Sequence, residues 1–358
     1  MLHIPFDIAI DPMERLLLVN FEKDPDSLYV GFEPQVFDDG VTGKGHLVIG
    51  WRKDGRVDVY HEPGLRPDAQ KYDIAGKGLA HMVEREMTHA SFEVNDRGVQ
   101  AHYEFQDLQE RNVLIRINEN HSRKRKPFGL LAPMGDVAEN PSAMPLVLLQ
   151  DFYFVRKKHS EVAVSVAGRS HRADMLPLPI DGNKMTFIRY STAPLIATFN
   201  PAFPGNLPTV SVQEGHKLVR YGHREIHLEW LKGKPAIRRM VFQNTRHPVE
   251  LRFDQPFPAL EALGQTATVS GSFSIEAHPS TGRIGGDYSV EKQGDRVRIV
   301  MVPTKGWKPR PDKLSLRFLY TVAKVFKSWP ATYRWTADIE ATNDGGYAMT
   351  SEWKRIKK

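Results

Sequence analysis

The residues best suited to chemistry stand together in one short segment, His223 to Trp230. If this segment is a β-strand, its side chains alternate between two faces. One face then carries His223, Glu225, His227 and Glu229, and the other carries Ile226, Leu228 and Trp230. Imidazole and carboxylate groups on one face can bind a metal ion, act as acid and base, or simply remain hydrated.

The spacing along such a strand narrows these choices. Side chains two positions apart lie about 6.5 to 7 Å apart, so His223 and His227 are about 13 Å apart and do not share one ion. We therefore assign no metal and no cofactor. We predict His227 and Glu229 as the catalytic pair, with Glu225 orienting His227, and His223 and Trp230 as ligand contacts. The alternative is a hydrated face on a half-buried strand.

A second polar row is predicted in the first half of the chain. Residues 91–94 and 99–105 flank the turn sequence Asn95-Asp96-Arg97-Gly98, which indicates a hairpin. The alternation places His102 and Glu104 on one face, opposite Tyr103 and Phe105. If this half also binds a ligand, His102, Glu104 and Tyr103 are its expected contacts. A solvent-facing row is again the alternative.

The surrounding sequence predicts the elements that hold these rows. Alternating runs joined by Gly, Asp, Asn and Pro turns recur along the chain, for example at 47–60 around Asp54-Gly55 and at 288–302 around Gly294-Asp295. This pattern is typical of an all-β protein with antiparallel strands. Residues 78–90 fit either a short helix or an irregular strand.

One amphipathic helix is predicted near residues 313–329, before Pro330. Its apolar stripe contains Leu314, Phe318, Val322, Val325, Phe326 and Trp329. Because basic residues surround this stripe, the helix could bind a membrane surface. Its position between strands favours packing of the stripe against the β-structure instead.

The chain has 358 residues, more than the roughly 250 to 300 at which a single core stops growing. The highest concentration of the turn-forming residues Pro and Gly lies at residues 200–208. We therefore predict an N-terminal β domain at 1–204 and a C-terminal β domain at 205–358 that contains the helix. Each is expected to be a barrel or a sandwich.

Composition excludes several classes of function. Cysteine is absent, which excludes disulfides and thiolate chemistry, and no run of about 20 apolar residues predicts a transmembrane segment. The net charge of +6 is small beside 49 basic and 43 acidic residues. The one dense basic run, Arg123 to Lys126, lacks interleaved aromatic residues, so we expect no nucleic acid partner. The simplest location is the cytoplasm, and the oligomeric state is open.

The plan of the chain resembles the tandem lipocalin-like proteins that include the AttH group and the carotenoid hydratase hydroxyneurosporene synthase. The resemblance covers the whole chain and lies in its pattern of alternating apolar and polar runs separated by turns, as at Leu47 to Tyr60 and Gly285 to Val302. It implies a hydrophobic small molecule as partner, with hydratase or isomerase activity that needs no cofactor. One alternative is a carbohydrate-active β-sandwich that uses His/Glu acid-base chemistry, with sugars stacking on Trp230, Trp307 or Trp335. Another is a structural or interaction protein without catalysis.

Overall fold

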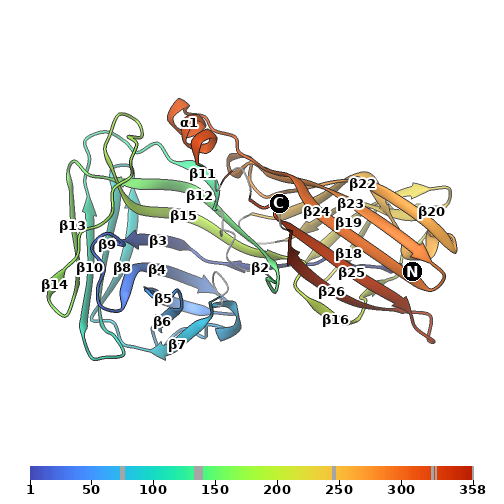
Figure 1. Cartoon of the computed structure of the whole chain (residues 1–358), viewed down its shortest axis with the longest axis horizontal. Coiled ribbons are helices and arrows are strands. Elements are labelled where there is room, and N and C mark those ends of the chain that lie inside the picture. The colour runs from blue at the N-terminus through green and yellow to red at the C-terminus, as the bar shows by residue number, and fades with distance from the viewer. Residues whose placement is uncertain (73–76, 133–139, 244–246, 324–325, 327–328, 357–358) are drawn as a thin grey trace.

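A computed structural model describes residues 1–72, 77–132, 140–243, 247–323, 326 and 329–356. Strands dominate it, and they pair almost entirely in antiparallel fashion, so the all-β prediction is confirmed. The described parts of the chain form two halves arranged end to end (Figure 1). Among the described helices, none has the length and apolarity that a membrane span needs.

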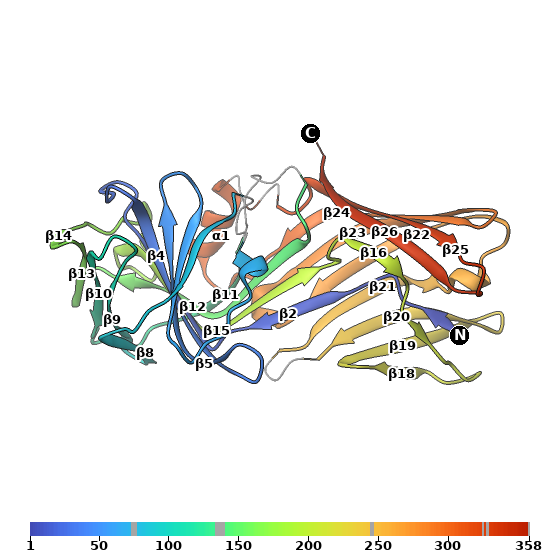
Figure 2. The ribbon, with the colours of Figure 1, turned by 90° about the horizontal axis from the view of Figure 1, so that it is seen from below.

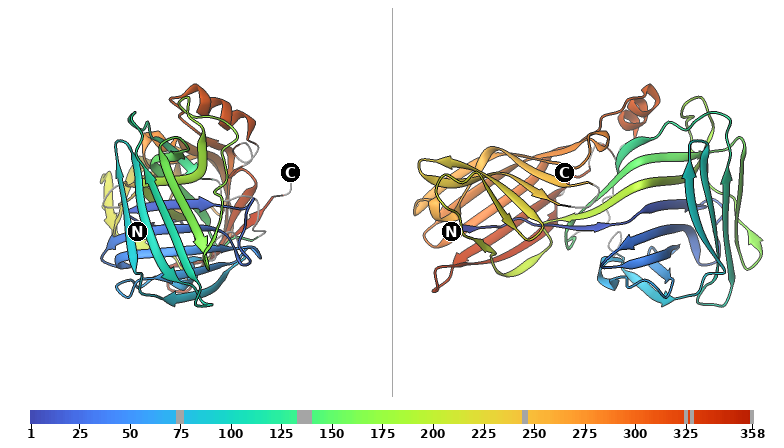
Figure 3. Two further views of the ribbon diagram at one scale, coloured as in Figure 1. Left: turned by 90° about the vertical axis from the view of Figure 1, so that its left-hand side faces the viewer. Right: turned by 180° about the vertical axis from the view of Figure 1, so that it is seen from behind.

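The first half contains two sheets that cross each other (Figure 3). The larger has nine strands: β2 (Ile8–Pro12), β3 (Arg15–Asn20), β4 (Tyr29–Asp39), β5 (Gly43–Arg52), β6 (Val57–His61), β7 (Leu79–Glu84), β11 (Phe128–Ala132), β12 (Met144–Arg156) and β15 (Met185–Phe199). The smaller has five: β8 (His89–Asn95), β9 (Gly98–Gln106), β10 (Asn112–Glu119), β13 (Ser160–Val166) and β14 (Arg169–Ser170). Aromatic contacts such as Tyr60 with Phe105 join the two sheets.

Local pairing confirms the predicted hairpins of this half. Val48 lies opposite Tyr60 and Val94 opposite Val99, as their turns required. The segment that fitted helix or strand forms β7 and the start of β8. β7 pairs with β6 in parallel, an exception among these sheets, and the short helix η1 (Ala69–Tyr72) lies between the two strands in the chain.

The second half is one ten-stranded antiparallel sheet. Its strands are β16 (Phe203–Asn206), β18 (Leu218–Tyr221), β19 (Arg224–Leu231), β20 (Lys234–Phe242), β21 (Val249–Pro258), β22 (Thr266–Glu276), β23 (Arg283–Gln293), β24 (Arg296–Lys308), β25 (Tyr333–Ala341) and β26 (Tyr347–Arg355). The hydrogen-bonded order starts at β16 and ends at β18, so the described strands form no closed barrel. The prediction of a barrel or a sandwich for each half is therefore unconfirmed, and the boundary between residues 204 and 205 stays a prediction.

The N-terminal segment of the chain packs against the second sheet. Residues 2–8 run between the β26 side and the β19 side (Figure 2). The two-residue strand β1 (Leu2–His3) pairs there with β17 (Thr209–Val210), and the Phe6 ring contacts Phe253, Phe257 and Trp335. Phe6 is 2% exposed. The first residues of the chain therefore belong to the core of the second half.

The halves also meet along β11 and β15. Phe199 at the end of β15 packs on Phe273, and its backbone carbonyl accepts a hydrogen bond from the Trp353 indole at 3.2 Å. Gly129 of β11 lies against η4 (Pro279–Thr281), where a Cβ atom would collide with the backbone of Ser280. Another short helix, η3 (Leu260–Ala262), follows β21. This packing fixes the two halves against each other.

The predicted helix exists as α1 (Leu314–Val322), and it stands out from the sheets (Figure 1). The prediction that its Leu314, Phe318 and Val322 stripe packs inward is wrong: these side chains are 80%, 56% and 49% exposed. Leu316 and Tyr320, on the opposite face, are buried instead. Tyr320 packs there on Trp307 and Phe326. Phe326 and the buried Trp329 are the two members of the predicted stripe that do pack inward. Val325, predicted in the stripe, lies outside the described residues.

A matched pair of substitutions tests this orientation. We expect Leu316→Ala to lower the free energy of unfolding by about 2 to 5 kcal/mol, because it opens a cavity under the helix. Leu314→Ala should change it by less than about 0.5 kcal/mol, because that side chain faces water. Urea unfolding of both variants measures the difference. Equal costs would contradict the orientation.

Candidate functional site

The polar row predicted on residues 223–229 lies on β19, and its apolar partners Ile226 and Leu228 are buried on the other face. Glu229 is 48% exposed, and its cationic neighbour Arg238 is 45% exposed. His223 lies in the preceding turn and is exposed. The row therefore lies on the solvent side of the sheet.

Arginines hold this row on both sides. The side chain of Glu225 accepts a hydrogen bond from Arg220 Nε at 3.1 Å, and Arg239 Nη2 lies 2.9 Å from His227 Nε2. Burial, reinforced by the charge of Arg239, lowers the pKa of His227. Arg239 in turn reaches Glu250 at 3.4 Å. The partners observed are thus arginines from neighbouring strands, and the catalytic roles of His227, Glu229 and Glu225 stay predictions.

The predicted tryptophans differ in accessibility. Trp230 is half-buried, and its indole donates a hydrogen bond to the carbonyl of His216 at 2.7 Å. Trp307 and Trp335 are 6% and 0% exposed, so neither indole has a free face on which a sugar could stack. Nothing in these three side chains favours the carbohydrate alternative.

The first half separates the three residues that were predicted together. Tyr103 is fully buried, and its hydroxyl lies 3.0 Å from His46 Nδ1 in the space between the sheets. His102 and Glu104 lie on the opposite, outer face of β9, as the alternation predicted. They join a residue of β8 that was not predicted, His89, which lies directly opposite Glu104.

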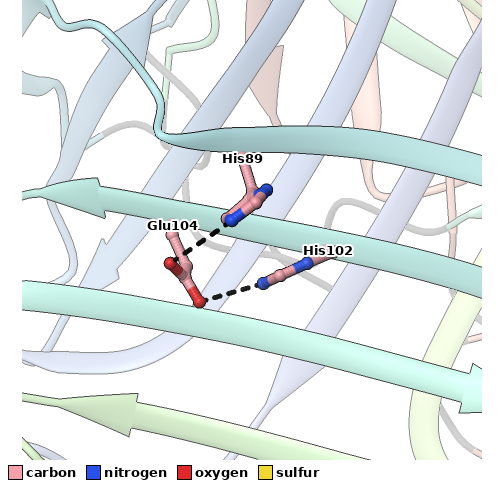
Figure 4. A group of neighbouring side chains, drawn as sticks. All are labelled: His89, His102 and Glu104. Atoms are coloured by element: carbon pink, nitrogen blue, oxygen red, sulfur yellow. Dashed lines mark hydrogen bonds and ion pairs between the residues drawn. The ribbon is translucent and has the colours of Figure 1, made fainter.

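These three side chains form a compact cluster (Figure 4). His102 Nε2 lies 3.0 Å from Glu104 Oε1, and His89 Nε2 lies 3.9 Å from Glu104 Oε2. The two imidazole rings stack with their centroids 4.3 Å apart and their planes at 15°. The hydrogen bond from His102, with the charges of both histidines and Arg116, lowers the pKa of Glu104. The cluster thus presents two imidazoles and a carboxylate to solvent.

His89 could have been found from the sequence. The turn Asn95-Asp96-Arg97-Gly98 pairs Asn95 with Gly98, and counting back from it places His89 opposite Glu104. Because residues 78–90 fit either a helix or a strand, the sequence predicts the first strand of the hairpin only from Ser91 onward, which leaves His89 outside it. The missing signal was the length of β8.

A pocket of about 90 Å³ lies in the second half, beside the N-terminal segment of the chain. Its apolar lining is Ile4, Pro5, Phe6, Pro201, Phe203, Leu207, Pro208, Trp335 and Met349, and its polar lining is Asp7, Asn200 and Arg224. Arg224 is the first residue of β19, and its guanidinium forms an ion pair with Asp7. The singled-out strand therefore contributes to a pocket, but through a residue that was not predicted.

The ion pair and the backbone shape one wall of the pocket. Arg224 Nε lies 3.1 Å from Asp7 Oδ1, and Asn200 Oδ1 accepts a hydrogen bond from the Asp7 amide at 3.0 Å. Asp7 is the one carboxylate among the residues that line this pocket.

Comparisons of the chain with protein-family models, with curated proteins and with solved structures found no match.

Proposed function

We propose that this protein binds a small hydrophobic molecule in the pocket beside its N-terminal segment. The observation that carries the proposal is the lining: a mainly apolar wall with a few convergent polar groups is the usual composition of a ligand site. The proposal is in keeping with the resemblance to tandem lipocalin-like proteins, whose ligands are apolar.

The size of the pocket limits what it can hold. Whole drug-sized ligands occupy roughly 300 to 1,000 Å³, whereas a dry engineered cavity of about 150 Å³ accepts benzene. A pocket of about 90 Å³ therefore takes one end of a ligand, such as the last few carbons of an aliphatic chain. The remainder of the ligand lies outside.

The polar groups suggest how the ligand is oriented. Arg224 is 17% exposed and Asp7 is 43% exposed, so the pair has an accessible side. A hydroxyl group on the ligand can bind to Arg224 or Asp7, and a carboxylate can bind to Arg224, while the apolar part of the ligand contacts Phe6 and Met349. If the protein catalyses hydration or isomerisation, Asp7 is the carboxylate that we place nearest the substrate.

A substitution that fills the pocket tests the proposal. Octan-1-ol should raise the thermal unfolding midpoint of the wild-type chain, because a ligand that binds only the folded state stabilises it. Met349→Trp places a larger side chain at the pocket wall, so the affinity for octan-1-ol, measured by titration calorimetry, should fall about tenfold or more.

The matched control is Val41→Trp, the same new side chain at a position that is 83% exposed. It should bind octan-1-ol as the wild type does. If Met349→Trp destabilises the fold, Phe203→Trp gives a second change at the pocket wall. Undiminished binding by a folded pocket variant would disprove the site.

A further inference from the structure

We propose that His89, His102 and Glu104 bind a divalent transition-metal ion of the zinc type. This site lies on the outer face of the five-stranded sheet and is independent of the pocket in the second half. One potential ligand atom from each side chain can be chosen so that all three lie within 4.8 Å of one another. Three such donors around one ion are the usual protein contribution to a zinc site with an open position.

The strand geometry explains why the three side chains converge. His102 and Glu104 are two positions apart on β9, so they point to the same face, and His89 is the register partner of Glu104 on β8. Directly opposed residues of an antiparallel pair have their Cβ atoms about 4.5 to 5.5 Å apart. A ligand pair on one strand and a third ligand across from it therefore surround one point above the sheet.

The distances require little movement to accept an ion. Zinc binds imidazole nitrogen and carboxylate oxygen at about 2.0 to 2.2 Å, so ligand atoms around it lie roughly 3.3 Å apart. The observed separations are 3.0 Å from His102 Nε2 to Glu104 Oε1 and 3.9 Å from His89 Nε2 to Glu104 Oε2, and the three donor atoms lie within 4.8 Å of one another, so they need to close by about 1 to 1.5 Å at most. Both imidazoles already turn a nitrogen toward the carboxylate (Figure 4).

The donor set selects the class of ion. Two imidazoles and one carboxylate suit zinc, nickel, copper or cobalt, whereas magnesium and calcium prefer oxygen ligands throughout. His89 is 53% exposed, so the outer side of the site is open to water or to an exchangeable ligand. The ion would then have three protein ligands and one free position.

Arg116 is the opposing charge at this site. Its Nη2 atom lies 3.8 Å from Glu104 Oε1, and its side chain is 54% exposed. A guanidinium beside the carboxylate competes with the metal for the same negative charge. Because this side chain is exposed, it can move into water when the ion binds. Arg116 should therefore weaken the site without closing it.

The test uses the full chain, freed of metal with a chelator. Zinc titrated by calorimetry should bind at one equivalent with a dissociation constant of about micromolar or tighter. Cobalt(II) should give the visible absorption of a nitrogen- and oxygen-coordinated ion. His89→Ala and Glu104→Gln should each weaken zinc binding about tenfold or more. Arg116→Gln should strengthen it, because the competing charge is gone.

The chain has 14 histidines, so a matched control is essential. His216→Ala removes an exposed histidine from a loop in the other half and should leave the titration unchanged. Circular dichroism checks that each variant is folded, and His89→Gln replaces His89→Ala if it is not. The proposal is overturned if the wild type binds no more tightly than the His89 variants, or if Arg116→Gln binds equally or more weakly.

Discussion

Arg156→Met should lower the free energy of unfolding by about 3 to 5 kcal/mol, the largest single effect on stability that we expect. Arg156 is 1% exposed and Glu119 is 0% exposed, and Arg156 Nε donates to Glu119 Oε1 at 2.5 Å. Removing the arginine leaves a carboxylate buried without its counter-charge. The cost arises mainly from that orphaned charge and less from the lost attraction.

The position of this ion pair explains its importance. Glu119 ends β10 of the five-stranded sheet and Arg156 ends β12 of the nine-stranded sheet. Arg156 also donates to the carbonyl of Arg97, in the turn between β8 and β9, and to that of Arg123, in the loop between β10 and β11. Burial raises the pKa of Glu119, and the charge of Arg156 opposes that shift. The pair thus fixes one corner where the two sheets meet.

Two further variants separate charge from packing. Arg156→Met combined with Glu119→Gln should recover much of the lost stability, since no charge then remains buried. Arg296→Met breaks an exposed pair of the same type, with Glu340, and should cost at most about 1 kcal/mol. Urea unfolding measures all of these variants. A cost for Arg156→Met as small as that for Arg296→Met would contradict the argument.

Local pattern predicted much of the fold because each hairpin is specified by its own residues. Asp54-Gly55 and the turn at Asn95 to Gly98 set the pairing of β5 with β6 and of β8 with β9. The same alternation correctly placed His102 and Glu104 on the outer face of β9. Such features depend on neighbours in sequence, so periodicity reveals them.

Contacts between distant segments could not be predicted in this way. Asp7 and Arg224 are 217 positions apart, and the residues around each of them do not indicate that the N-terminal segment packs against the second sheet. Glu119 and Arg156 are 37 positions apart, so their pairing is not indicated by either neighbourhood in the sequence. The face of α1 was misjudged because helical spacing identifies an apolar stripe but not what covers it. Leu314 and Phe318 belong to that stripe and remain exposed.

Arg125 illustrates the same limit. The run from Arg123 to Lys126 was interpreted as a basic segment without a nucleic acid partner. Arg125 in fact forms a two-pronged ion pair with Asp151, with Nη1 to Oδ1 and Nη2 to Oδ2 distances of 2.6 and 2.7 Å. It is 13% exposed, so one member of the run supports the structure. Composition alone cannot separate such a residue from its solvated neighbours.

A second large effect is expected from Glu33, a carboxyl group on β4 that is 6% exposed. Burial raises its pKa from 4.5 to about 7, although hydrogen bonds from Gln35 and Trp51 and the charge of Arg189 oppose the shift. Below about pH 4.5 both the folded and the unfolded chain hold this proton. As the pH rises through 7, the folded chain also loses it and must bury an anion. The stability associated with this group is therefore complete at low pH and lost as the pH rises through 7.

The neighbouring amide fits a protonated carboxyl group. Gln35 Nε2 donates to Glu33 at 2.8 Å, and Trp51 Nε1 donates at 3.0 Å. Gln35 Oε1 is buried and has no hydrogen-bond partner. If the Gln35 amide turns over, its oxygen can accept from a protonated Glu33 or from a glutamine at position 33. Glu33→Gln can therefore keep the local hydrogen bonds while removing the buried charge.

Glu33→Gln should accordingly remove most of the pH dependence. A pKa shift from 4.5 to about 7 corresponds to about 3 kcal/mol of stability lost between low pH and about pH 8. Urea unfolding from about pH 4 to about pH 8 should show the wild type falling relative to the variant, with the two nearly equal at the acid end. Glu84→Gln, at an exposed position on β7, is the matched control and should follow the wild type. Parallel curves for the wild type and Glu33→Gln would mean that Glu33 keeps its ordinary pKa, because a group titrating alike in both states contributes no slope.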